Sequence, residues 1–364
     1  MMIDQVASAF ENKDYRTAAN LLKQLLKDSP ENPQVQLYLG KLHEVSGKHE
    51  KAEKVYLKLL RDSTNNKIIT QARQGLQRLE DIEKKQRQDK IAQAKSNPEN
   101  QESAVLILEP ISNELKKSAA QKLASIIGVD AYTARLSLPS RGWRLYRSGA
   151  NGELKFYGEQ LLDSGIPCFW TSLAKVNKIE VFQVNYFKDF GDKVTVVCEN
   201  QDKQLGSLEF KWSEVTAQVQ GLLPIFEEVV DLSVRGKLQR KTQTQDYFHF
   251  CDLHLPKRNC ILRIYDNGYN FNKGVAISPQ NSQNTIRINW NNLINFLKTK
   301  LPQVKIWSDF KPFAETMLDQ TEVLQQIQSH IHIFRRDKTS WDNAFQLYSC
   351  LVFLKQRSEE HTSE

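Results

Sequence analysis

The sequence predicts an α+β protein of several domains, with α-helical hairpins at its N-terminus followed by an α+β region whose sheet is mainly antiparallel. Residues 1–85 carry apolar residues at helical spacing, and the pattern recurs after 34 residues. From about residue 173 onward the apolar residues instead alternate with a period of two, and short turns separate the runs. A chain of 364 residues is long enough for two or three such domains.

The N-terminal repeat depends on residues that recur at the same place in two hairpins. Ala18 and Ala52 lie 34 residues apart, as do Leu22 and Tyr56. The small alanine lets the two helices of each hairpin approach closely. The other packing positions are occupied by Tyr15, Leu25, Leu26, Leu39, Gly40, Gly47 and Leu59. This pattern resembles the tetratricopeptide repeat, and the resemblance covers about residues 1–85, including a capping helix from residue 67 to 83.

The resemblance implies a surface that binds a protein or peptide and performs no chemistry. Some members of the family hold a terminal carboxylate with lysine, asparagine and arginine, but the matching positions here carry other residues. The residues at these positions predict an apolar groove that binds an extended peptide or a partner helix. The predicted binding residues of this groove are Ile3, Ala7, Leu37, Tyr38, Lys41, Ile68 and Ala72. The chain's own linker or a second copy of the chain would cover the same face equally well, so self-association is the alternative.

The residues after the repeat predict a linker and then a small α+β module. Residues 86–103 are polar with almost no large apolar side chain, which is typical of a linker. Residues 104–172 read as strand, helix, helix, strand, helix and strand. Within them Pro110 stops the first strand, Asp130 can cap the second helix, and Gly165 suits the end of the third.

Residues 173–356 predict an antiparallel, β-rich α+β region. Most of its strands are separated by short turns, which favour antiparallel pairing. The strand-like runs are residues 179–184, 194–197, 208–212, 247–253 and 261–265, and two helices are predicted over residues 290–297 and 310–318.

The last eight residues, 357–364, read Arg-Ser-Glu-Glu-His-Thr-Ser-Glu. This string resembles the translation of a common sequencing-library adapter. We therefore leave it out of the fold prediction and expect the native chain to continue past Gln356 with other residues.

Composition predicts an ordinary soluble protein of the cytoplasm with no membrane contact. Hydrophobic residues make up 40% and charged residues 26% of the chain. No apolar run approaches the roughly 18–20 residues that cross a bilayer, and the first residues lack the zones of a signal peptide. The five cysteines are scattered without a paired motif, which favours reduced, buried thiols.

The common catalytic and cofactor motifs are absent from the sequence. It has no phosphate-binding glycine loop, no dinucleotide fingerprint and no zinc-protease or serine-hydrolase pattern. The one metal-like cluster is His249, Cys251, His254 and Cys260, but on an extended strand His249 and Cys251 face away from His254. The sequence therefore predicts no enzyme, no cofactor and no metal site.

Nucleic-acid binding is the alternative function. A net charge of +7 and a pI of about 9.0 suit an acidic partner. Basic and aromatic residues are also interleaved, as in proteins that stack bases, at Arg141, Trp143, Arg144, Tyr146 and Arg147, and basic residues gather at Arg235, Lys237 and Arg240. No recognised nucleic-acid-binding signature accompanies them, so an adaptor that binds proteins through the repeat remains the leading interpretation.

Overall fold

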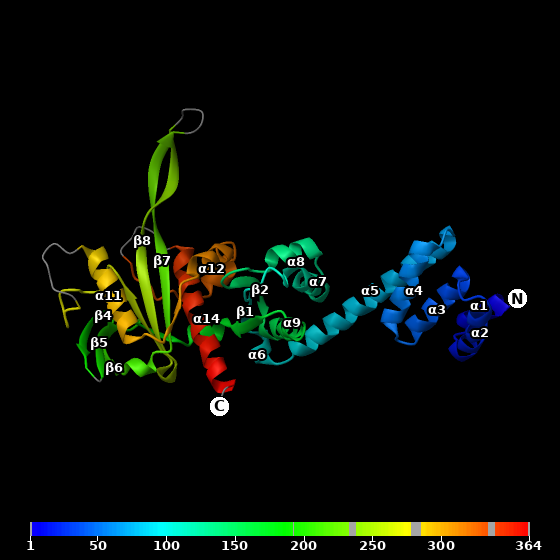
Figure 1. Cartoon of the computed structure of the whole chain (residues 1–364), viewed down its shortest axis with the longest axis horizontal. Coiled ribbons are helices and arrows are strands. Elements are labelled where there is room, and N and C mark those ends of the chain that lie inside the picture. The colour runs from blue at the N-terminus through cyan, green and yellow to red at the C-terminus, as the bar shows by residue number, and fades with distance from the viewer. Residues whose placement is uncertain (1, 192, 233–237, 278–284, 334–338, 363–364) are drawn as a thin grey trace. The chain divides into compact units, whose positions relative to one another are not determined.

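A computed structural model describes residues 2–191, 193–232, 238–277, 285–333 and 339–362. The chain divides into two compact units, Met1–Gln93 and Ala94–Glu364. Figure 1 shows the order of the helices and strands along the chain. Among the described residues, no helix has both the length and the apolar character needed to cross a bilayer.

The first unit consists of helices, as predicted. Asp14 caps the second helix by accepting from the Thr17 amide, and Asn32 caps the third by accepting from the Gln34 amide. Gly47 has a positive φ of 71° in the turn between the third and fourth helices. The helices are α1 (Met2–Glu11), α2 (Tyr15–Asp28), α3 (Pro33–Val45), α4 (His49–Asp62) and α5 (Asn66–Ala94).

Two apolar clusters hold this unit together. The α1–α2 hairpin contacts α3 through a cluster made of Val6, Leu22 and Val35. The α3–α4 hairpin packs against α5 through Leu37, Ala52, Tyr56, Leu59, Ile68, Ala72 and Leu79. Helix α5 thus caps the second hairpin.

Residues 86–103 differ from the predicted linker. Helix α5 continues to Ala94, a short helix α6 (Pro98–Gln101) follows, and strand β1 (Ser103–Leu108) begins within the segment. The cause is composition, because glutamine, lysine, arginine and alanine are good helix formers as well as typical linker residues. A solvated helix and a linker therefore have the same polar pattern.

The second unit begins with a three-stranded antiparallel sheet in the order β2-β1-β3. The predicted succession of strand, helix, helix, strand, helix and strand is present. The Asp130 side chain accepts from the amides of Tyr132 and Thr133, and Gly165 has a φ of 77° beyond the third helix. These elements are α7 (Lys116–Ile127), α8 (Ala131–Ser137), β2 (Arg144–Ala150), α9 (Asn151–Asp163) and β3 (Cys168–Ser172), followed by α10 (Leu173–Asn177).

A seven-stranded sheet in the order β10-β7-β8-β9-β4-β5-β6 forms the rest of the unit. The pairs β10–β7 and β4–β9 are parallel and the other four are antiparallel, so the mainly antiparallel prediction is confirmed. The strands are β4 (Glu180–Phe190), β5 (Val194–Glu199), β6 (Leu205–Phe210), β7 (Ala217–Leu232), β8 (Leu238–Leu255), β9 (Cys260–Tyr265) and β10 (Lys305–Trp307). The helices are α11 (Ile286–Lys300), α12 (Phe310–Met317), α13 (Thr321–Gln325) and α14 (Ser340–Thr362).

Helices cover both faces of the large sheet. The core on one face includes α11, and the core on the other includes α12, α13 and α14. The second of these cores also contains Val105 and Ile107 of β1. Residues on either side of the predicted boundary at residue 172 therefore share one core. The backbone of α14 extends to Thr362, into the segment that resembles an adapter.

Candidate functional site

The centre of the helical unit is a tyrosine held between two glycines. A Cβ atom on Gly40 of α3 or on Gly75 of α5 would lie 2.5 Å from a ring carbon of Tyr56, so any larger residue would collide with the ring. The Tyr56 hydroxyl donates to Glu44 at 2.7 Å, and Arg78 donates to the same carboxylate at 2.6 and 2.9 Å. This contact locks α5 onto α3.

The carboxylate in this contact has a perturbed pKa. Burial alone would raise the pKa of Glu44, but the hydrogen bonds from Arg78 and Tyr56 outweigh it and lower the pKa. Burial and the adjacent carboxylate raise the pKa of Tyr56. Glu44 and Arg78 lie 34 residues apart, one repeat, and carry opposite charges. That spacing is a sequence signal from which the pair was predictable.

On the surface of the first unit, an aromatic stack lies beside a lysine on helices α1 and α3. The rings of Phe10 and Tyr38 stack with centroids 5.4 Å apart, and the Lys41 ammonium lies 5.2 Å from the Tyr38 centroid. Ile3 and Ala7 are partly exposed on the same α1 helix. We call this surface, made of Ile3, Ala7, Phe10, Tyr38 and Lys41, the α1–α3 face.

The predicted binding residues therefore separate into two groups. Ile3, Ala7, Tyr38 and Lys41 are partly exposed and belong to the α1–α3 face. The prediction of a surface role is wrong for Leu37, Ile68 and Ala72, which are 2%, 7% and 0% exposed in the core between α3, α4 and α5. Helices in a stack pack on more than one side, so apolar spacing alone does not identify the open side. Sequence reasoning also missed Phe10.

The described residues of the nucleic-acid alternative do not form a stacking surface. Arg144 donates to the Leu136 carbonyl at 2.7 Å, Arg147 pairs with Glu153 at 3.3 Å, and Arg240 pairs with Glu228 at 3.9 Å. Arg141 is exposed and Tyr146 is partly buried. Two further predicted residues, Arg235 and Lys237, lie outside the described residues.

Trp143, the aromatic centre of that alternative, belongs to the core. It is 6% exposed and its ring packs 4.8 Å from Phe169 and 4.9 Å from Trp307, centroid to centroid. The cation over these rings comes from the chain itself, because the Lys355 ammonium lies 5.6 Å from the Trp143 centroid and pairs with Glu109. A nucleic-acid base has no access to this ring, so its predicted stacking role is wrong.

The metal-like cluster is dispersed over several environments. The His249 ring contacts Arg287, Cys251 accepts from the Gln218 amide at 3.1 Å, and Cys260 is buried in the core that includes α11. His254 faces α14. In the described part of the chain, no group of three or more histidine, cysteine, aspartate or glutamate residues is arranged to hold a metal ion.

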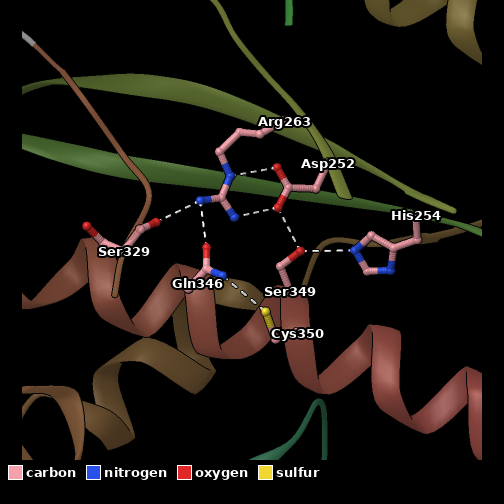
Figure 2. Close-up of polar contacts among 7 residues, drawn as sticks. All are labelled: Asp252, His254, Arg263, Ser329, Gln346, Ser349 and Cys350. Carbon is pink, nitrogen blue, oxygen red and sulfur yellow. Dashed lines mark hydrogen bonds and ion pairs between the residues drawn. The ribbon is translucent and has the colours of Figure 1, made fainter. Parts of the chain in front are cut away.

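The second unit contains a buried polar network that ties the sheet to α14 (Figure 2). Arg263 of β9 forms two hydrogen bonds to Asp252 of β8, at 2.9 and 2.7 Å, with exposed side-chain fractions of 1% and 0%. Arg263 also donates to the Ser329 carbonyl at 2.9 Å and to Gln346 at 2.8 Å. The guanidinium thus has hydrogen-bond acceptors on β8, on α14 and on the segment that precedes α14.

The network includes a serine, a histidine and an aspartate, but their order differs from that of a catalytic triad. The Ser349 hydroxyl donates to Asp252 at 2.7 Å, so His254 Nε2 is the donor in its 3.0 Å contact with that hydroxyl. In a catalytic triad the histidine lies between serine and aspartate, whereas here the serine lies between the other two. All three residues are 0% exposed, so substrate does not reach the hydroxyl.

Two histidines, His254 within this network and His330 beside it, give the unit a pH dependence. Burial lowers the pKa of His254 to about 4, and burial together with Arg263 lowers the pKa of His330 to about 4, from an ordinary 6.5. Between pH 6.5 and 4 the unfolded chain binds more protons than the folded one. The contribution to stability is therefore complete above pH 6.5 and is lost as the pH falls towards 4.

We expect the urea concentration at the unfolding midpoint of this unit to decrease as the pH is lowered from 6.5 to 5. The decrease is expected to be smaller in the His330→Asn variant. Asparagine tolerates the positive φ of 48° at this position. Urea titrations followed by tryptophan fluorescence at several pH values measure the slope, and an unchanged slope in the variant would show that His330 does not contribute.

A protein-family model described as a tetratricopeptide repeat matches residues 9–76. The match runs from the end of α1 into α5 and includes α2, α3 and α4 in full. Neither the curated proteins nor the solved structures give a match to the chain. The chain is therefore a protein that contains tetratricopeptide repeats, assigned over residues 9–76 of its N-terminal unit.

Proposed function

We propose that this protein is a non-enzymatic adaptor that binds a segment of another protein on its α1–α3 face, while its second unit localises or modulates the complex. The observation that carries the proposal is the partly exposed Phe10–Tyr38 stack beside Lys41, in a repeat of a family whose members bind proteins. Partly exposed aromatic side chains beside a cation are typical of protein interfaces, where they bury a large area at little entropic cost.

The charges around Lys41 define the chemistry of the partner. Burial and then the positive charge of Arg78 lower the pKa of Lys41, so its charged form is poorly compensated. Glu44 is the nearby acid, and it is already bonded to Arg78 and Tyr56. A partner segment with an apolar side chain next to a carboxylate would cover Tyr38 and supply the missing negative charge.

A cytoplasmic location is part of the proposal. The five cysteines are free thiols, and all are buried in the described structure. Burial raises the pKa of Cys168 to about 12, which keeps its thiol protonated and unreactive. Thiols in this state suit a reducing compartment.

Capture of partner proteins from a lysate of the source cells tests the proposal. Tyr38→Asp places a charge in the stack and is expected to reduce capture at least about tenfold, the equivalent of about 1.4 kcal/mol. Val45→Asp, at a 49% exposed position on the same helix, is the matched control and keeps full capture. Equal capture by both variants would remove the α1–α3 face from the proposal.

A further inference from the structure

Strands β7 and β8 continue beyond the sheet as a two-stranded ribbon. Among the described residues, β10 pairs with Ala217–Val219 of β7 and β9 with Phe250–Leu255 of β8, whereas the β7–β8 ladder runs on to Leu232 and Leu238. Figure 1 shows this hairpin leaving the sheet. We call residues 222–232 and 238–247 the arm. A two-stranded ribbon is marginally stable in water on its own, so an arm of this length gains stability if a further surface covers it.

One face of the arm carries most of its exposed apolar side chains, and we call it the apolar face. Alternate residues of a strand share a face, and residues directly opposite in an antiparallel ladder share it too. Even-numbered residues of β7 therefore lie with their ladder partners, Tyr247 opposite Pro224 and Leu238 opposite Leu232. The exposed apolar side chains on this face are Leu222 (41%), Phe226 (37%), Val230 (64%), Leu238 (75%) and Tyr247 (36%).

The edges of the arm resist pairing with another strand. The register shifts between Ile225 and Phe226, which leaves Gln245 of β8 as an extra residue, and such a bulge disrupts strand addition. Lys241 adds a charge along β8, while Pro224 removes a backbone donor from β7. The apolar face, and not an edge, is therefore the surface suited to docking.

Charge on the arm is divided between its strands. Glu227, Glu228 and Asp231 are on β7, and Arg240 and Lys241 are on β8, which also carries the acid Asp246 at the base of the arm. Glu228 and Arg240 lie on the apolar face, opposite Thr242 and Val230, and form an ion pair of 3.9 Å with side chains 53% and 80% exposed. An ion pair this exposed contributes little to the stability of the fold, so both side chains remain available to pair with charges on another molecule.

We propose that the apolar face of the arm docks against the same face of a second copy of this chain. A two-fold axis parallel to the arm lays β7 of each copy over β8 of the other. Glu228 of one copy then lies over Thr242 of its mate, diagonal to the mate's Arg240, in both halves of the interface. A two-fold axis that crosses the strands at the level of Glu228 would instead bring β7 over β7 and place Glu228 against Glu228. The charge division thus selects the parallel arrangement and identifies a second copy as a complementary occupant.

Light scattering coupled to size exclusion over a range of concentrations tests this interface with the full chain. The expected mass at high concentration is twice the 42.1 kDa of one chain. Val230→Asp is expected to return the mass to that of a monomer. Leu136→Asp, at a 58% exposed position on α8, is the matched control and leaves the dimer intact. A wild-type chain that stays monomeric throughout, or a Val230→Asp variant that stays dimeric, overturns the proposal.

Charge reversal tests the arrangement itself. Glu228→Arg and Arg240→Glu are each expected to be monomeric, because each places like charges across the interface, and an equimolar mixture of the two is expected to form a dimer. Glu209→Arg on β6 is the control and keeps the dimer, because Glu209 forms an exposed ion pair with Lys193 away from the arm. Single variants that dimerise like wild type, or a mixture that stays monomeric, contradict the paired strands. Unchanged far-ultraviolet circular dichroism verifies that each variant is folded.

Discussion

Substitution of Arg263 by leucine is expected to lower the free energy of unfolding of the second unit by about 3–5 kcal/mol. The change leaves the Asp252 carboxylate buried at 0% exposure without its cation. It also removes the donor to the Ser329 carbonyl and to Gln346. A loss of this size is a large fraction of the total free energy of unfolding of a domain of ordinary stability.

Tryptophan fluorescence during urea unfolding isolates this effect, because all six tryptophans lie in the second unit. Arg141→Leu, at an exposed arginine, is the control and is expected to change stability by less than about 0.5 kcal/mol. The double variant Asp252→Leu/Arg263→Leu removes both charges, and its loss is expected to be smaller than that of Arg263→Leu alone. A double variant less stable than the single one would show that the pair is not the source of the effect.

Substitution of Tyr56 by alanine is expected to cost the first unit about 3–5 kcal/mol, because it opens a cavity where a fully buried ring now lies between Gly40 and Gly75. Tyr56→Phe keeps the ring and removes only the hydrogen bond to the Glu44 carboxylate. Its expected cost is about 1.5–3 kcal/mol, the range for hydrogen bonds to charged groups.

The first unit contains no tryptophan, so loss of helix by circular dichroism with unchanged tryptophan fluorescence identifies it as the unit affected. Leu57→Ala, at a 50% exposed position on the same helix, is the matched control and changes the midpoint little. If Tyr56→Ala and Leu57→Ala were equally stable, the ring would not be the anchor of α5.

Local features of the fold were predictable from the sequence. The 34-residue spacing identified the hairpins, and Asp130 and Gly165 fixed the ends of helices because caps depend on neighbouring backbone. The buried pair of Asp252 and Arg263 was not predictable in this way. Its partners on α14 lie more than 80 residues further along the chain, and no local pattern reports such contacts.

The candidate site was predictable in part for a related reason. Tyr38 and Lys41 were identified from their places in the repeat, and both lie on the α1–α3 face. Ile68 and Ala72 were assigned to the same surface but pack inside, because α5 closes over the second hairpin. The sequence places Trp143 on a strand among basic residues, yet the aromatic rings that surround it come from β3, β10 and α14. Sequence shows which residues are apolar, and the stacking of distant elements decides which of them remain exposed.

Site-specific photo-cross-linking in the source cells tests the binding role of the α1–α3 face most directly. A photoreactive amino acid at position 38 of α3 is expected to give a cross-link to a discrete partner protein. The same residue at position 57 of α4, where Leu57 is 50% exposed outside this face, is expected to give none. Equal cross-linking at both positions, or at position 57 alone, would contradict the assignment of the binding surface.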